Sequence, residues 1–246
     1  MKKSTKNTII VVAIIIGLIA VLSGSLVFTS AMSYKADEDA LNALETNALV
    51  KVTYNDDKDY YLFEPTVPSE SAFVFIPGGL VEAKAYAPLM RALAENGITC
   101  ILLEVKFNLA VFDKNAPADI KEDFPNIQTW SLGGHSLGGA VASMYIEKHT
   151  DEYENLVLLG SYPEGDLSKL NITCVTIYGS EDTVMNKSKF EKSKSNYPDA
   201  HTIYEIEGGN HAQFGSYGKQ RGDGEAKITK QEQIAITVAR LLPVLL

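Results

Sequence analysis

The chain has 246 residues and a formal net charge of −9, and 46% of its residues are hydrophobic. This length and composition suit one globular domain with a short appendage, and they exclude collagen-like, repetitive and disordered proteins. Because the only charges before Lys35 are the lysines at positions 2, 3 and 6, the part that follows carries −12. Such an acidic domain is a poor match for nucleic acid, which binds clusters of lysine and arginine.

The chain begins with an apolar, uncharged run at residues 9–28. About 20 such residues cross the hydrocarbon core of a bilayer as a helix. Lysines precede the run and Asp37, Glu38 and Asp39 follow it, so the positive-inside rule places the N-terminus in the cytoplasm and the rest outside. We therefore expect a single-pass membrane anchor within residues 1–33 and an extracytoplasmic domain.

A cleaved signal peptide is the alternative for this run, with Thr29 and Ala31 as the small residues of its cleavage site and a secreted domain as the result. Signal peptides have apolar cores of about 7–15 residues, which is shorter than this run and favours the anchor. Residues 34–48 mix alanine, leucine and acidic residues at roughly helical spacing. We interpret them as a stalk or a packing helix.

Residues 49–246 have the pattern of an α/β domain. Two alternating segments, 49–54 and 60–64, flank a polar turn and predict an antiparallel hairpin. Further strands are expected at 72–76, 98–105, 130–134, 156–159, 173–178 and 202–206, and helices at 86–95, after residue 136 and at 231–242. This order predicts a mostly parallel sheet with helices on both faces, in which functional groups gather at the carboxyl ends of the strands.

A candidate nucleophile lies in Gly134-His135-Ser136-Leu137-Gly138, which fits the pattern G-x-S-x-G. A strand precedes the motif and a helix follows it, as a nucleophile elbow requires. A serine at so sharp a turn takes a strained backbone conformation, and small neighbours let the turn close. The alternative is a glycine-rich packing turn, but the phosphate-binding spacing G-x-G-x-x-G is missing. The motif therefore predicts Ser136 as the nucleophile.

A serine nucleophile needs a base, which is usually a histidine. Of the four histidines, His135 adjoins the serine, His149 lies at the far end of the following helix, and His201 opens the last strand. Only His211 follows the carboxyl end of a strand, in a glycine-rich loop that can fold back over the sheet. By elimination, His211 is the expected base.

A carboxylate should hold the histidine ring and balance its charge, and it should lie between the serine and the histidine in the chain. The candidates at strand ends are Asp166, Glu181 and Asp182. Asp182 closely follows the strand at 173–178 and is favoured, while the other two remain alternatives.

The oxyanion hole should use the backbone N–H of Leu137, the residue after the nucleophile, and a second N–H from the loop after the strand at 72–76. Pro77 has no N–H, so Gly79 or Leu80 must supply the second donor. Pro-Gly-Gly also fits a plain β-turn.

Three segments that follow strands are expected to shape the site, and two of them, residues 107–126 and 213–225, could form its walls. Residues 160–172 leave room for a loop but for no lid domain, which predicts an open site for short acyl groups. The glycine-rich segment after His211 carries Phe214 and Tyr217, which are expected to place aromatic rings against a substrate. A simple connector to the last helix is the alternative for this segment. Two cysteines, Cys100 and Cys174, lie in apolar runs and are expected to stay unpaired and buried.

In these residues and motifs the chain resembles the α/β-hydrolase superfamily. Within it, the chain is similar to a group of small, lid-poor bacterial hydrolases related to dienelactone hydrolases. The matching stretches are residues 76–80, 106–110, 133–139, 161–163, 178–182 and 208–218. The resemblance spans residue 72 to the C-terminus and implies Ser136 as nucleophile, Asp182 as acid and His211 as base. Many relatives carry His-Gly where this chain has Pro77-Gly78. The dienelactone enzymes themselves use a cysteine nucleophile, so their substrate is not carried over.

The function expected from the sequence is hydrolysis of an ester or similar acyl bond of a small substrate at the cell membrane, without a cofactor or a metal. One alternative is transfer of the acyl group to an acceptor other than water by the same three residues. Another is a catalytically inactive hydrolase scaffold that serves as a binding module.

Overall fold

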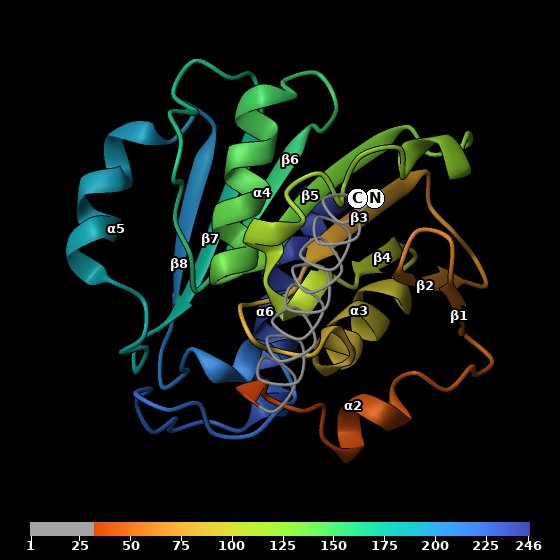
Figure 1. The fold of residues 1–246 in the computed structure, drawn as a ribbon, viewed down its shortest axis with the longest axis horizontal. Helices are drawn as coiled ribbons and strands as arrows, with labels where there is room; N and C mark the ends of the chain where they lie inside the picture. Colours follow the sequence, from red (N-terminus) through yellow and green to blue (C-terminus); the bar gives the residue numbers. More distant parts are fainter. Residues whose placement is uncertain (1–31) are drawn as a thin grey trace, which may run out of the picture.

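The computed structural model describes residues 32–246. Within that part of the chain, eight strands form one sheet in the order β1-β2-β4-β3-β5-β6-β7-β8 (Figure 1). The strands are β1 (Val50–Asn55), β2 (Tyr60–Pro65), β3 (Ser71–Ile76), β4 (Thr99–Leu103), β5 (Thr129–His135), β6 (Asn155–Leu159), β7 (Thr173–Gly179) and β8 (His201–Ile206).

The sheet is antiparallel at one end and parallel through the rest. β1 pairs with β2, and β2 with β4, in antiparallel register, whereas all pairs from β4 through β3 to β8 are parallel. The predicted hairpin and the mostly parallel sheet are therefore confirmed. Parallel strands share one carboxyl edge, and the loops that leave this edge carry the candidate site.

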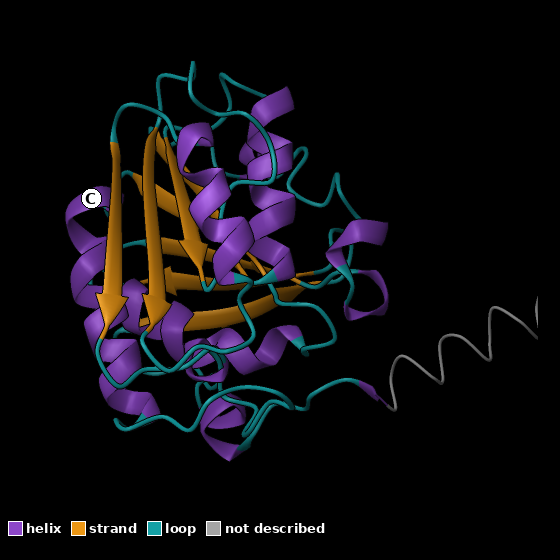
Figure 2. Ribbon diagram, turned by 90° about the vertical axis from the view of Figure 1, so that its left-hand side faces the viewer, coloured by secondary structure: helices purple, strands orange, loops and turns teal. Residues whose placement is uncertain are grey.

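Helices cover both faces of the sheet (Figure 2). The α-helices of the described residues are α2 (Glu38–Asn42), α3 (Ala87–Ala94), α4 (Leu137–Lys148), α5 (Lys187–Ser193) and α6 (Lys230–Leu245). Alternate residues of the fully buried strand β3 enter two separate cores: Phe73 and Phe75 pack with α3 and α6, whereas Val74 and Ile76 pack with α4. This two-sided burial explains why β3 is apolar at every position except its first.

One helix and several short turns escape prediction from the sequence. α5 reads Lys-Ser-Lys-Phe-Glu-Lys-Ser, and only Phe190 offers a large apolar side chain. Short 3-10 helices are η1 (Ala83–Tyr86), η2 (Lys106–Asn108), η3 (Ala110–Phe112), η4 (Lys121–Asp123), η5 (Lys194–Asn196) and η6 (Ala212–Phe214). Cys100 in β4 and Cys174 in β7 are buried and unpaired, as expected, because three strands separate them in the sheet.

The segment at residues 34–48 packs against the domain through α2, whose N-terminus is capped by the Asp37 carboxylate and whose Ala40 is fully buried. Within residues 32–246, no helix combines the length and apolar character needed to cross a bilayer. The expected anchor at residues 9–28 lies outside the described residues.

Candidate active site

Ser136 occupies a strained turn between β5 and α4. Its backbone has φ 52° and ψ −119°, a conformation that side chains with a Cβ atom rarely adopt. Two hydrogen bonds fix this turn against the end of β6: the Ser136 N–H donates to the Leu159 carbonyl at 2.9 Å, and the Ser161 hydroxyl donates to the Ser136 carbonyl at 2.9 Å. The surrounding structure thus holds the strain that a nucleophile elbow requires.

The glycines around Ser136 are required because backbone crowds them. A Cβ atom on Gly134 would lie 2.7 Å from the Ile76 carbonyl oxygen, and one on Gly138 would overlap the same carbonyl. The start of α4 therefore lies directly against the end of β3. This close approach brings the loop after β3 next to the serine.

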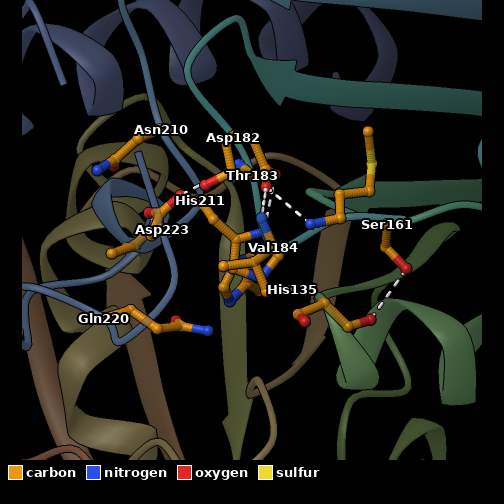
Figure 3. Close-up of polar contacts among 12 residues, drawn as sticks. His135, Ser161, Asp182, Thr183, Val184, Asn210, His211, Gln220 and Asp223 are labelled. Atoms are coloured by element: carbon orange, nitrogen blue, oxygen red, sulfur yellow. Dashed lines mark hydrogen bonds and ion pairs between the residues drawn. The ribbon is translucent and has the colours of Figure 1, made fainter. Parts of the chain in front are cut away.

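His211 and Asp182 form a buried pair at the same edge of the sheet (Figure 3). His211 Nδ1 lies 2.7 Å from Asp182 Oδ2, and the two side chains are 1% and 0% exposed. The other carboxylate oxygen, Oδ1, accepts the N–H groups of Val184 at 2.9 Å and Met185 at 2.8 Å. Three hydrogen bonds therefore satisfy the buried carboxylate, and its Oδ2 fixes the orientation of the imidazole ring.

Gly160 makes room for this pair, and the sequence analysis did not identify it. Its φ is +51°, and a Cβ atom there would lie 2.8 Å from His211 Nδ1 and 3.3 Å from Asp182 Oδ2. The signal in the sequence was a glycine at the carboxyl end of a buried strand, next to the two loops that carry the acid and the base.

A second histidine packs against the first. The rings of His135 and His211 have centroids 4.4 Å apart. The Tyr86 hydroxyl accepts the Gly78 N–H at 3.0 Å and shares a second hydrogen bond, 2.8 Å long, with His135 Nδ1. Burial lowers the pKa of His135 well below its usual value, and a charge on His211 lowers it further. His135 is therefore a neutral ring behind His211, and the role of Tyr86 was not predicted from the sequence.

The Nε2 atom of His211 is buried and has no hydrogen-bond partner among the described residues. His211 packs on the ring of His135, the residue that immediately precedes Ser136. No hydrogen bond therefore joins this nitrogen to the Ser136 hydroxyl. Such hydrogen bonds are often long in unliganded enzymes and shorten when substrate binds.

A family model described as the alpha/beta hydrolase family matches residues 72–235. The chain belongs to the α/β-hydrolase family. The match spans β3 to the first turns of α6 and includes the elbow, the Asp182 loop and the His211 loop. It confirms the superfamily predicted from the sequence, and it supports a hydrolase.

Solved structures share the α/β-hydrolase fold with this chain at low sequence identity. A predicted CIB-like hydrolase from Thermoplasma acidophilum is 15% identical, with a TM-score of 0.55 over 78% of this chain and 97% of that one. TT1662 from Thermus thermophilus is 13% identical, with a TM-score of 0.58 over 80% and 98%. Est1E from Butyrivibrio proteoclasticus is 12% identical, with a TM-score of 0.54 over 80% and 98%. No curated protein matches the chain by sequence.

The loop after β3 in this α/β-hydrolase narrows the choice of the second oxyanion donor. The Leu80 N–H donates to the Asn108 carbonyl at 2.7 Å, and the Gly78 N–H is bonded to Tyr86. The Gly79 N–H bonds to no described residue. A Cβ atom on Gly79 would lie 2.9 Å from the Leu137 side chain, so Gly79 lies beside the first residue of α4.

The other acids considered from the sequence point away from His211. Glu181 forms an ion pair with Lys227 at 2.7 Å, and this hydrogen bond lowers the pKa of its carboxyl group. Asp166 accepts the Ser168 N–H at 3.0 Å on the surface. Of these three acids, therefore, only Asp182 contacts the ring of the candidate base.

The aromatic residues after His211 are placed differently from the sequence expectation. Phe214 is 1% exposed and packs against His135, and Tyr217 is 7% exposed and packs between Tyr34 and Tyr86. Their rings belong to the apolar core on the α3 and α6 side of the sheet. We therefore assign them to the packing of the His211 loop and not to a surface that faces a substrate.

Proposed function

We propose that this α/β-hydrolase is a membrane-anchored serine hydrolase that cleaves an ester or similar acyl bond of a small substrate. The observation that carries the proposal is the buried Asp182–His211 pair at 2.7 Å. The Nε2 of His211 has no hydrogen-bond partner among the described residues, and its ring packs on His135, the residue before Ser136 in the elbow. An imidazole with one nitrogen fixed by a carboxylate and the other free is the arrangement that activates a serine hydroxyl.

In the proposed reaction, the Ser136 oxygen forms a bond to the acyl carbon while its proton passes to His211 Nε2. The carbonyl electron pair moves onto oxygen, where the N–H groups of Leu137 and Gly79 stabilise the charge. The tetrahedral intermediate then loses the alcohol, which takes the proton from His211. Water then attacks the acyl-enzyme in the same way and gives its proton to His211. The intermediate releases the acid, and the serine oxygen takes back the proton. Asp182 stays ionised and balances the imidazolium that forms in each half.

A small substrate is favoured by the segment between β6 and β7. Residues 160–172 form a loop without helix or strand, and Ser161 within it bonds to the elbow. The segment is too short for a lid domain that could bury a long acyl chain. The apolar run at residues 9–28 and the lysines before it support membrane attachment with the domain outside the cytoplasm.

Labelling with a fluorophosphonate probe tests the proposed nucleophile. The wild-type chain should react covalently at Ser136, and Ser136→Ala should lose both labelling and nearly all ester turnover. Ser168→Ala serves as the matched control, because Ser168 bonds to the Asp166 carboxylate at the surface, and it should leave both unchanged. Labelling that persists in Ser136→Ala would remove the serine from the proposed role.

A further inference from the structure

The first described residues bind two of the loops that leave the carboxyl edge of the sheet. The Tyr34 N–H donates to the Leu80 carbonyl at 2.7 Å, and the Glu82 N–H donates to the Tyr34 carbonyl at 3.0 Å. The side-chain amide of Asn108 in η2 donates to the Ser33 hydroxyl at 3.0 Å. The chain thus enters the domain beside the loop that holds the proposed oxyanion donor.

The same segment also binds the loop that follows His211 (Figure 1, where the orange start lies beside the blue loops). The Asp37 N–H donates to the Ser216 carbonyl at 2.9 Å, and the Arg221 N–H donates to the Tyr34 hydroxyl at 2.9 Å. The Tyr34 ring packs on Tyr217 with centroids 5.5 Å apart. Contacts to loops after β3, β4 and β8 fix this entry segment firmly to the carboxyl edge.

Few residues separate the apolar run at residues 9–28 from the segment that contacts the carboxyl edge of the sheet. Five residue steps separate Phe28, the last residue of the run, from Ser33. A fully extended chain covers at most about 3.3–3.6 Å per residue, so these steps span no more than about 18 Å. If residues 9–28 cross a bilayer, Ser33 and the loops that it contacts must lie within about 18 Å of the hydrocarbon core. The lipid headgroups occupy part of this distance.

Large apolar side chains are exposed beside the contact between Ser33 and Asn108. Met32 is 52% exposed, Phe107 is 37% exposed and Phe112 is 63% exposed. The two phenylalanine rings contact each other edge to face at 6.1 Å, and the residue after Phe107 is the Asn108 that binds Ser33. We call Met32, Phe107 and Phe112 the apolar rim. Phe107 has a φ of +60°, a strained conformation for a residue with a side chain.

We infer that the apolar rim rests on the surface of the bilayer that holds residues 9–28, so that the carboxyl edge with the candidate triad faces the membrane. This inference depends on the proposed membrane anchoring, and it is independent of the proposed reaction. Exposed aromatic residues next to a membrane anchor are stable at the headgroup level, where an apolar ring leaves water without entering the hydrocarbon core.

The orientation can be measured with two single-cysteine variants of the full chain in phosphatidylcholine vesicles. Phe112→Cys places a thiol in the apolar rim. Val67→Cys places one at the opposite edge of the sheet, in the connection that precedes β3, where Val67 is 82% exposed. Both native cysteines are buried, so a fluorescent maleimide will select the new thiol. A nitroxide on the lipid headgroups then quenches a dye that lies near the surface.

We expect quenching at position 112 to be at least two-fold stronger than at position 67. Equal quenching at the two positions, or stronger quenching at position 67, would overturn the inference. Flotation of the vesicles separates the two proposals. A chain that floats without preferential quenching at position 112 keeps the anchor and loses the orientation, whereas a chain that does not float loses both. Fluorophosphonate labelling of Ser136 is unaffected by either result.

Discussion

The Tyr86 hydroxyl lies 2.8 Å from Nδ1 of His135 and 3.0 Å from the Gly78 nitrogen. One buried hydroxyl therefore joins the ring that packs on His211 to the loop that carries Gly79. This contact links the two halves of the proposed site, the base and the oxyanion donor, although 49 residues separate Tyr86 from His135 in the chain.

Tyr86→Phe should weaken both halves while leaving the fold in place. The change strands a buried N–H and a buried ring nitrogen, each of which costs about 1–3 kcal/mol of unfolding free energy. We expect kcat for a soluble ester to fall about tenfold with little change in KM, because the residue positions the catalytic groups and does not contact substrate. Denaturant unfolding and steady-state kinetics on the same preparation will check this. A variant with lower stability but an unchanged kcat would limit Tyr86 to packing.

Asp182→Asn should lower kcat by about 10³-fold or more, because an amide cannot hold the imidazole in the required tautomer or balance its charge. His211→Ala should cost at least as much. Glu181→Gln is the matched control, since that carboxylate bonds to Lys227 at the surface, and its activity should stay near wild type. Near-normal turnover in Asp182→Asn would contradict the assignment of the acid.

Ser136→Gly should be more stable than Ser136→Ala by about 1 kcal/mol. Both variants lack the hydroxyl, but alanine keeps the Cβ atom that makes φ 52° and ψ −119° costly. Glycine adopts this region freely, and the relief exceeds its larger loss of chain entropy on folding. Thermal unfolding of the two inactive variants measures the difference. Equal melting temperatures would mean that the elbow stores no strain.

The stability of the protein should fall as the pH drops below about 6.5, in part because of His135. Burial lowers its folded-state pKa well below the ordinary value of 6.5. Just below pH 6.5, the unfolded chain therefore binds a proton at this histidine and the folded chain does not. The stability contributed by the neutral ring is thus fully present above about pH 6.5 and is lost as the pH falls toward the folded-state pKa.

His135→Asn tests this origin, since an amide can still form a hydrogen bond with the Tyr86 hydroxyl but does not titrate. Melting temperatures across the same pH range should decline less steeply in the variant than in the wild type. Parallel curves would assign the acid sensitivity to other groups.

A series of ester substrates should give the highest kcat/KM for short acyl groups. The loop at residues 160–172 provides no lid, and the aromatic rings of Phe214 and Tyr217 are buried in the core. Little apolar surface remains to stabilise additional methylene groups, each of which would contribute about 0.8 kcal/mol if buried. Rates measured for esters of two to twelve acyl carbons, at about equal solubility, provide the check. A maximum at long chains would require an acyl pocket that these loops do not form.

The sequence determined the parts of this protein that depend on neighbouring residues. Alternating and apolar runs predicted the hairpin and the parallel strands, because the pattern of apolar side chains along a strand reflects which of its faces are buried. The elbow was predictable because a turn of that shape requires glycines within a few positions of Ser136. The sheet order confirms the hairpin and the parallel strands, and the family match confirms the superfamily.

Contacts between distant segments were decided only by the tertiary structure. Glu181 and Asp182 are adjacent in sequence, yet one bonds to Lys227 on the surface and the other to His211 in the interior. Composition could not show that Phe214 and Tyr217 face the core, nor that Tyr86 and Gly160 shape the surroundings of His211. A side chain's direction at a loop depends on which other loops meet there, and only the packing of the whole sheet brings those loops together.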